Sequence, residues 1–439
     1  MKKVLVVLLL LSVIAFGVFA NGSSETKTET EEVTIRFYNY ALSEAAKKSW
    51  WEGIISDFEA ENPNIKIECV SVDFNSMIQT LNNDIASGLS VDMILGENSW
   101  VVDLASAGFL SKPEDVLSEE FYSGYNKEVL NALTYDGAVY AVPHYFSPWI
   151  IYVNKDLVEG AGLSMDDFPT TYEGLKSWIE KLSDVYQDIT SNSYNSNIKT
   201  IFGLTTAEVP ATGLCLKSML AAFGGDMITE DEELADFTSG KNATAIEELL
   251  DFDKWLISNG YDVSNQKLKD YRAAFGAGNV VMYVDQAWGY AQISGVAGEE
   301  GKAFTVSATL PTKLGTYGEG KTILSAHVFL YGANLTDAKK DAIDKFTQYV
   351  TDAKQLEGYL NDIGVAFPAH EITESVTLPS MLDGAKEGMN NLTTQPNPVG
   401  VASAQTKLAT MLLNYCVNGM SRSDSISQFV KDAEFILNN

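Results

Sequence analysis

Four short segments of the chain place aromatic rings beside amide or carboxylate side chains. They are Tyr38-Asn39-Tyr40, Glu97-Asn98-Ser99-Trp100, the segment His144-Tyr145-Phe146-Ser147-Pro148-Trp149, and Asp285-Gln286-Ala287-Trp288. A ring face can stack on an apolar C–H surface, while amides and carboxylates hydrogen-bond to hydroxyl groups. A binding site for a polyhydroxylated solute needs this combination. The segment 285–288 is the strongest candidate, because a carboxylate, an amide and an indole lie close together in it.

The elements around these segments explain why they can meet in space. Alternation at 33–38 predicts a strand, helical spacing at 44–60 predicts a helix, and further strands at 65–72 and 92–95 are again separated by a helix. This order is typical of an α/β fold with a mostly parallel, doubly wound sheet, whose ligands bind outside the carboxyl ends of the strands. The rule selects as ligand-binding residues Tyr38, Asn39, Tyr40, Glu97, Asn98, Trp100, Tyr145, Trp149, Asp285, Gln286 and Trp288.

Each of these rings could instead belong to the hydrophobic core, since aromatic side chains dominate cores as well as clefts. Trp50, Trp51, Trp178 and Trp255 lie at core spacing inside predicted helices. These four tryptophans are therefore left out of the predicted site.

Catalytic chemistry finds little support in the sequence. It lacks a GxSxG elbow, an HExxH helix and a GxGxxG fingerprint. Adjacent acids such as Asp166-Asp167 could imitate a glycosidase pair, but 59 acidic residues make such neighbours common. The histidines His144, His327 and His370 are scattered, so neither a metal nor a cofactor is expected. We predict a binding protein, with a secreted glycan-active enzyme as the less favoured alternative.

The first residues predict export. Lys2 and Lys3 precede an apolar run that ends at Ala20 in small residues, the pattern of a cleaved signal peptide over residues 1–20. Residues 21–32 are rich in Ser, Thr and Glu and predict a flexible leader. Asn21, not a cysteine, follows Ala20, so a lipid anchor is not supported. The protein is expected in the periplasm or at the outer face of the cytoplasmic membrane.

The exported chain of about 400 residues is long enough for two lobes. We predict one lobe from 33–143 plus 286–332 and the other from 144–285 plus 333–439, joined by several hinge crossings. Three cysteines at long separations exclude a disulfide framework and are expected to behave as buried apolar residues.

The acidic excess limits the classes of molecule that the protein can bind. The chain has 59 acidic and 30 basic residues, a net charge of −29, and loss of Lys2 and Lys3 makes it more negative still. Such an excess repels nucleic acid and anionic lipid, so neither is expected as a partner.

Several short motifs carry a resemblance that runs over nearly the whole exported chain. They include Phe58-Glu59-Ala60-Glu61-Asn62-Pro63, Ala107-Gly108-Phe109-Leu110, Val139-Tyr140-Ala141-Val142-Pro143, Tyr152-Val153-Asn154-Lys155-Asp156-Leu157 and Phe275-Gly276-Ala277-Gly278-Asn279. In order and spacing they resemble the family-1 extracellular solute-binding proteins, the maltodextrin-binding-like receptors of carbohydrate ABC importers. The resemblance implies a two-lobed periplasmic-binding-protein fold, a carbohydrate ligand, permease subunits of an ABC importer as partners, and a monomer.

The sequence departs from the family pattern near the predicted cleft. A small Gly-Gly pair is expected near Ser325, where this chain has Ser325-Ala326-His327-Val328. His327 therefore joins the predicted ligand-binding residues. Glu97 and Asp285 keep a basic or peptide-like solute open as the second choice, and the scarcity of Arg and Lys in the predicted loops argues against a phosphate ester.

Overall fold

The computed structural model describes residues 32–362, 366–373 and 376–438. The predicted signal peptide and all but the last residue of the predicted leader lie outside these residues. Within them, no helix is both long and apolar enough to cross a membrane.

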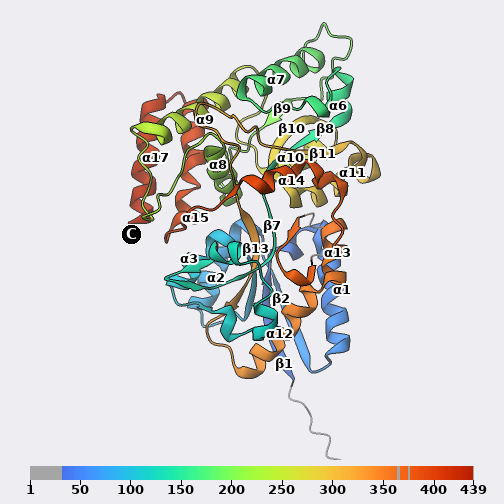
Figure 1. Ribbon diagram of the computed structural model, residues 1–439, viewed down its shortest axis with the longest axis vertical. Helices are drawn as coiled ribbons and strands as arrows, with labels where there is room; N and C mark the ends of the chain where they lie inside the picture. Colours follow the sequence, from blue (N-terminus) through green and yellow to red (C-terminus); the bar gives the residue numbers. More distant parts are fainter. Residues whose placement is uncertain (1–31, 363–365, 374–375, 439) are drawn as a thin grey trace, which may run out of the picture.

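The chain folds into two lobes, one above the other in Figure 1. The first lobe, below, holds a seven-stranded sheet in the order β14-β7-β13-β3-β1-β2, with β4 also paired to β13. Its strands are β1 (Val33–Asn39), β2 (Ile65–Ser71), β3 (Met93–Glu97), β4 (Leu110–Ser111), β7 (Val142–Ser147), β13 (Ser325–Gly332) and β14 (Phe367–Pro368). Its main helices are α1 (Ala45–Glu61), α2 (Met77–Ala86), α3 (Val101–Ser106), α12 (Asp337–Thr351) and α13 (Ala353–Asp362).

The second lobe holds a four-stranded sheet in the order β11-β8-β10-β9. Its strands are β8 (Trp149–Asn154), β9 (Thr200–Gly203), β10 (Val280–Gln286) and β11 (Thr305–Thr309). Its main helices are α6 (Lys155–Gly160), α7 (Tyr172–Tyr186), α8 (Pro210–Ala222), α9 (Gly240–Ser258), α10 (Leu268–Gly276), α11 (Tyr290–Phe304), α15 (Val401–Ala404), α16 (Lys407–Cys416) and α17 (Arg422–Leu437).

The predicted α/β fold with two lobes is confirmed, but the sheets are mixed and not mostly parallel. Strand β1 pairs in parallel with β2 and β3, whereas β13 runs antiparallel to both β3 and β7. In the second sheet β8 is antiparallel to β10 and β11. The crossings between the lobes explain this. Strands β8 and β13 each begin at the cleft, directly after a crossing, and run away from it. Strands β3 and β10 run toward the cleft, so the pairs β8–β10 and β13–β3 are antiparallel.

Several segments lie in the other lobe from the one predicted, among them α11 and β14. Residues 305–309, expected in the first lobe, form β11 and pair with β8. Helices α12 and α13, expected in the second lobe, cover the first sheet, and the Phe346 ring lies 5.8 Å from Phe37 and 5.0 Å from Phe58. In Figure 1 the orange α12 lies with the blue β1, whereas the red α15 and α17 lie in the upper lobe. The chain therefore crosses between the lobes near Pro148, near Leu324 and between β14 and the short 3-10 helix Ser380–Leu382, where the Met381 carbonyl accepts a hydrogen bond from Ser307 of β11.

The four tryptophans that were left out of the predicted site pack into the apolar cores of the two lobes. Trp51 and Trp178 are buried and Trp50 and Trp255 are half-buried, all packed into the two apolar clusters. The cysteine prediction is confirmed only for Cys215, because Cys69 is exposed and Cys416 is half-buried; all three are free thiols.

Candidate functional site between the lobes

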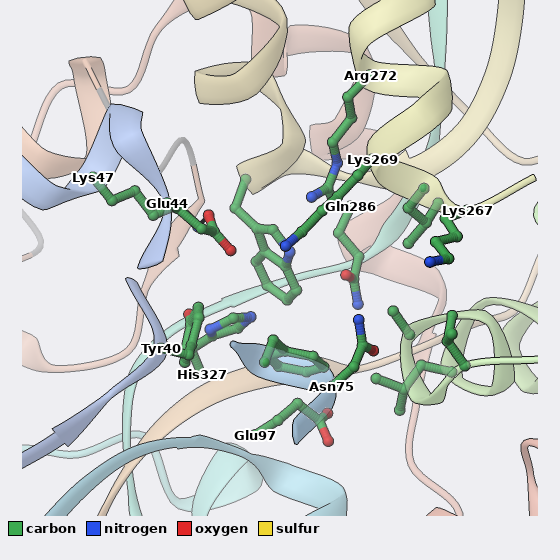
Figure 2. Close-up of a pocket in the computed structure, with 16 residues that line it drawn as sticks. Tyr40, Glu44, Lys47, Asn75, Glu97, Lys267, Lys269, Arg272, Gln286 and His327 are labelled. Atoms are coloured by element: carbon green, nitrogen blue, oxygen red, sulfur yellow. Dashed lines mark ion pairs between the residues drawn. The ribbon is translucent and has the colours of Figure 1, made fainter. Parts of the chain in front are cut away.

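A cavity opens between the two lobes (Figure 2). One wall comes from the first lobe, at the ends of β1, β2 and β3 and on β13; the other comes from α8, α10 and the end of β10 in the second lobe. The lining residues are Tyr40, Glu44, Lys47, Phe74, Asn75, Glu97 and His327 on the first wall and Val209, Ala211, Leu214, Lys267, Leu268, Lys269, Arg272, Gln286 and Trp288 on the second.

The local sequence turns the chain sharply where each wall strand ends. After β1, the Asn39 side chain accepts a hydrogen bond from Ala41 N at 2.8 Å and starts a short 3-10 helix that carries Tyr40. After β2, Asp73 accepts from Asn75 N at 3.0 Å in the same way. Asn and Asp stabilise such turns, because the side-chain oxygen accepts a hydrogen bond from a backbone N–H that has no backbone acceptor in the turn. The turns bring Tyr40 and Asn75 to the mouth of the cavity.

Four aromatic rings form a connected cluster at one side of the cavity. The Trp288 ring lies 4.1 Å from His327, edge to face, and Tyr145 stacks on His327 at 5.0 Å. Tyr40 packs on His327 at 4.9 Å, and its hydroxyl lies 3.1 Å from that of Tyr145. These contacts fix the rotamers of Trp288 and Tyr40, so the cavity presents rigid ring surfaces.

Polar atoms without partners surround these rings. Among the described residues, no hydrogen-bond partner is found for Asn75 Oδ1, Glu97 Oε1, Gln286 Nε2 or His327 Nδ1, and all four atoms are buried. In Figure 2 the amides of Asn75 and Gln286 point toward each other from opposite walls. Buried polar atoms are normally satisfied, because each unmade bond costs about 1–3 kcal/mol. The cavity therefore offers both donors and acceptors to an incoming polar molecule.

The ionisation of this wall is set mainly by burial. Burial raises the pKa of Glu97 to about 7, although hydrogen bonds from Ser99 and the charge of Lys217 act in the opposite direction. Burial also lowers the pKa of His327 to about 3, so its imidazole is neutral. At neutral pH the His327 imidazole is therefore uncharged, and Glu97 is present in both its protonated and its ionised form.

Two buried ion pairs border the cavity. Glu44 and Lys47 lie 3.0 Å apart; burial opposes the charge of the Glu44 carboxyl, but Lys47 and Arg272 outweigh burial and lower its pKa. Arg272 donates two hydrogen bonds to Asp285, both at 2.7 Å. Both pairs are internally neutral, so they shape the wall without presenting a free charge.

The comparisons with known proteins decide the family. The sequence profile of the bacterial extracellular solute-binding proteins matches residues 53–380, about three quarters of the chain. The chain belongs to this bacterial extracellular solute-binding protein family. The predicted resemblance to extracellular solute-binding proteins is confirmed.

Individual relatives of this solute-binding protein are distant. A binding protein of Brucella abortus (strain 2308) is 25% identical over 238 residues, 54% of each chain, so the match spans about half the length of that relative. A solute-binding protein of an ABC transporter from Thermotoga lettingae, solved with alpha-D-tagatose, has a TM-score of 0.78 at 18% identity and covers 93% of this chain and 100% of its own. The GacH receptor of Streptomyces glaucescens, solved unliganded and with acarbose, has a TM-score of 0.77 at 18% identity, with 93% and 99% covered.

Five of the predicted residues line the cavity of this solute-binding protein: Tyr40, Glu97, Gln286, Trp288 and His327. They come from four different strand ends or strands that lie far apart in the sequence. Tyr145 lies directly behind them, between Tyr40 and His327.

The other predicted residues have different places. Tyr38 is buried beneath α2, where its hydroxyl donates to Asp84 at 2.7 Å, and Asn39 caps the turn after β1. Trp149 donates its indole N–H to Ser325 at 3.2 Å, close to the hinge. Trp100 packs on Phe74 at 4.9 Å and lines a neighbouring groove.

Asp285 and Asn98 also lie outside this cavity. Both oxygens of Asp285 are occupied by Arg272, so this carboxylate stabilises the wall from behind. Asn98 lines an adjoining compartment.

Sequence reasoning missed several lining residues. Phe74 and Asn75 follow β2, and Val209 and Ala211 follow β9, so the rule of strand carboxyl ends could have found them had it been applied there. Lys267, Lys269 and Arg272 begin α10, which precedes β10, and no local signal marks them. They make the cavity more basic than the predicted loops indicated.

Replacing Glu97 with Gln should change how stability depends on pH. The pKa of Glu97 rises from 4.5 to about 7 on folding, so the folded protein keeps a proton that the unfolded chain loses between these values. Stability due to Glu97 is full below pH 4.5 and falls as pH rises to about 7, by about 3 kcal/mol. Urea unfolding at pH 4.5 and pH 8 should show a smaller loss for Glu97→Gln than for the wild type. Equal losses of stability in the variant and the wild type would contradict the raised pKa of Glu97.

Proposed function

We propose that this chain is an extracytoplasmic receptor that captures a sugar or oligosaccharide between its lobes and delivers it to an ABC-type import permease. The observation that carries the proposal is the juxtaposition of the Trp288 ring with four unpartnered polar atoms, on Asn75, Glu97, Gln286 and His327. A sugar ring has an apolar face for the indole and hydroxyls that donate and accept at its rim. No covalent step is needed, and the receptor holds its ligand without turning it over.

Two related structures support the ligand class. The Thermotoga lettingae protein was solved with tagatose and the GacH receptor with acarbose, and both share the fold of this chain. Both ligands are carbohydrates. A basic or peptide-like solute is less well supported, because Asp285 is occupied by Arg272, and Lys267 and Lys269 line the cavity. The signal peptide over residues 1–20, export and a monomeric state belong to the same proposal.

Contacts between the lobes indicate how capture works. Lys269 of the second lobe forms an ion pair with Asp73 of the first lobe at 2.8 Å. On another side of the cleft, the Gly400 N–H donates to Asp103 at 2.6 Å. Both contacts break when the lobes separate. We infer that they favour the closed form, while a bound solute that touches both walls adds the rest of the closing free energy.

Replacing Lys269 with Ala should weaken solute affinity slightly. Its side chain and that of Asp73 are each 44% exposed, and exposed ion pairs contribute at most about 1 kcal/mol. Calorimetric titration should show a loss of about fivefold or less at low salt, and a smaller loss at 0.5 M salt. Lys386→Ala removes an exposed pair with Asp383 inside one lobe and serves as control. A loss equal in both variants would refute the role in closure.

A thermal-shift screen tests the proposed function. The purified mature protein is heated with mono- and oligosaccharides, and with polyamines, amino acids and sugar phosphates as comparison ligands. A ligand at 100 times its Kd adds about 2.7 kcal/mol to the folded state and must raise Tm. We expect a clear rise with at least one saccharide. A response only to polyamines or amino acids would overturn the carbohydrate assignment.

A further inference from the structure

A second, smaller compartment adjoins the cavity described above. Leu214 lines both spaces, and Glu97 of the first is followed by Asn98 of the second. Like the first, the second compartment lies between the lobes, with Asn98 on one side and Lys217 of α8 on the other. A group of a ligand seated on Trp288 would have to reach past Glu97 to enter it.

The lining of this compartment is polar and buried. Six of its polar side chains are less than a tenth exposed: Asn98, Ser99, Lys217, Ser325, Gln395 and Gln405. Asn98 Oδ1 accepts from Ala326 N at 2.8 Å, and Ser325 accepts from the Trp149 indole. Gln405 differs, because its buried Oε1 has no partner among the described residues. It is an unused acceptor that requires a hydroxyl or another donor.

Lys217 carries the only charge among the described residues that line the compartment. Its side chain is almost fully buried, and its ammonium donates to Asn397 Oδ1 at 3.2 Å, which leaves further N–H donors available. Burial lowers the pKa of Lys217 to about 8, although the charge of Glu97 raises it. A buried ammonium is costly without an anionic partner, and Glu97 lines the neighbouring cavity instead.

We propose that this compartment binds the carboxylate of an acidic sugar, such as a uronic acid, on Lys217, with a sugar hydroxyl donating to Gln405. The inference rests on the proposed saccharide-binding function and narrows its ligand class. A charge-assisted hydrogen bond to a carboxylate gives the buried ammonium an anionic partner inside this compartment. A phosphate carries more charge and is usually met by an arginine cluster or a helix N-terminus. One lysine, placed inside α8, matches a carboxylate better.

Calorimetric titrations with paired saccharides test this inference. Glucuronate, galacturonate and digalacturonate are compared with glucose, galactose and galactobiose, and with glucose 6-phosphate. We expect at least one acid to bind about tenfold or more tightly than its neutral counterpart, since a buried charged hydrogen bond contributes about 1.5–3 kcal/mol. Lys217→Met keeps the length of the side chain and removes its charge, so the preference should disappear. Lys181→Met removes an exposed lysine from α7 and should leave the preference intact.

The outcomes separate this inference from the proposed function. Neutral sugars bound as tightly as their acids, or an acid preference that survives Lys217→Met, would overturn the inference and leave the saccharide receptor standing. Tighter binding of the sugar phosphate than of every uronate would overturn the carboxylate assignment. If no saccharide of either kind binds, both the inference and the proposed function fail.

Discussion

Replacing Trp288 with Ala should abolish measurable saccharide binding or weaken it by about 30-fold or more. The Trp288 ring lines the cavity and is held against His327 at 4.1 Å and Tyr145 at 5.7 Å, so it reaches the ligand already ordered. Truncation of a central, preorganised aromatic side chain commonly costs 2 kcal/mol or more of binding free energy, roughly the stated factor. Isothermal titration calorimetry with the best saccharide of the thermal-shift screen provides the measurement.

Trp255→Ala provides the matched control. Trp255 is a half-buried tryptophan of α9, where it stacks on Phe252 at 6.1 Å, away from the cavity lining. This variant should lower the free energy of unfolding and leave Kd unchanged. If Trp288→Ala binds the saccharide as well as Trp255→Ala does, the aromatic wall is not the ligand platform.

Replacing Asp285 with Ala should cost about 3–5 kcal/mol of unfolding free energy. The carboxylate is fully buried and accepts two hydrogen bonds from Arg272, one from Tyr283 and one from its neighbour Gln286 N. Its loss leaves the Arg272 guanidinium buried without the carboxylate that it hydrogen-bonds. Urea unfolding monitored by circular dichroism measures the effect, and Asp226→Ala, which removes an exposed pair with Lys241, should cost about 1 kcal/mol or less.

A double variant shows whether the lost stability comes from the unpaired charge of Arg272 or from the other hydrogen bonds of Asp285. If the cost in Asp285→Ala arises from an uncompensated charge, Arg272→Met in the same chain should recover most of the lost stability, because an apolar replacement of both partners is often nearly neutral. A double variant no more stable than Asp285→Ala would show that the carboxylate acts through Tyr283 and the backbone instead.

The fold was predictable where the spacing of apolar residues shows which face of an element is buried. The alternation at 33–38 and the helical spacing at 44–60 correspond to β1 and α1, because the apolar face of α1 packs on the apolar side chains of β1, as Trp51 does on Phe37. The lobe of α12 was not predictable in the same way. Its buried residues, such as Phe346, would look the same against either sheet, and only tertiary contact with Phe37 places it.

Some residues of the candidate site were likewise predictable from the sequence pattern, and others depend on tertiary contacts. Tyr40, Glu97 and Trp288 follow strands at the cleft, and strand order alone selects them. Asp285 shows the limit of this reasoning. Its residue type and its position at the end of a strand suit a ligand contact, but its carboxylate forms an ion pair with Arg272. Arg272 lies on the helix before the strand, where a single sequence carries no signal of proximity.

The most direct test of the central claim is a crystal structure of the mature protein with the saccharide that raises Tm most. The account predicts one saccharide between the lobes, with a ring face on Trp288 and hydroxyls about 3 Å from Glu97 Oε1 and Gln286 Nε2. A saccharide bound outside the cleft, or one in the cleft that leaves Trp288 and these polar atoms uncontacted, would contradict it.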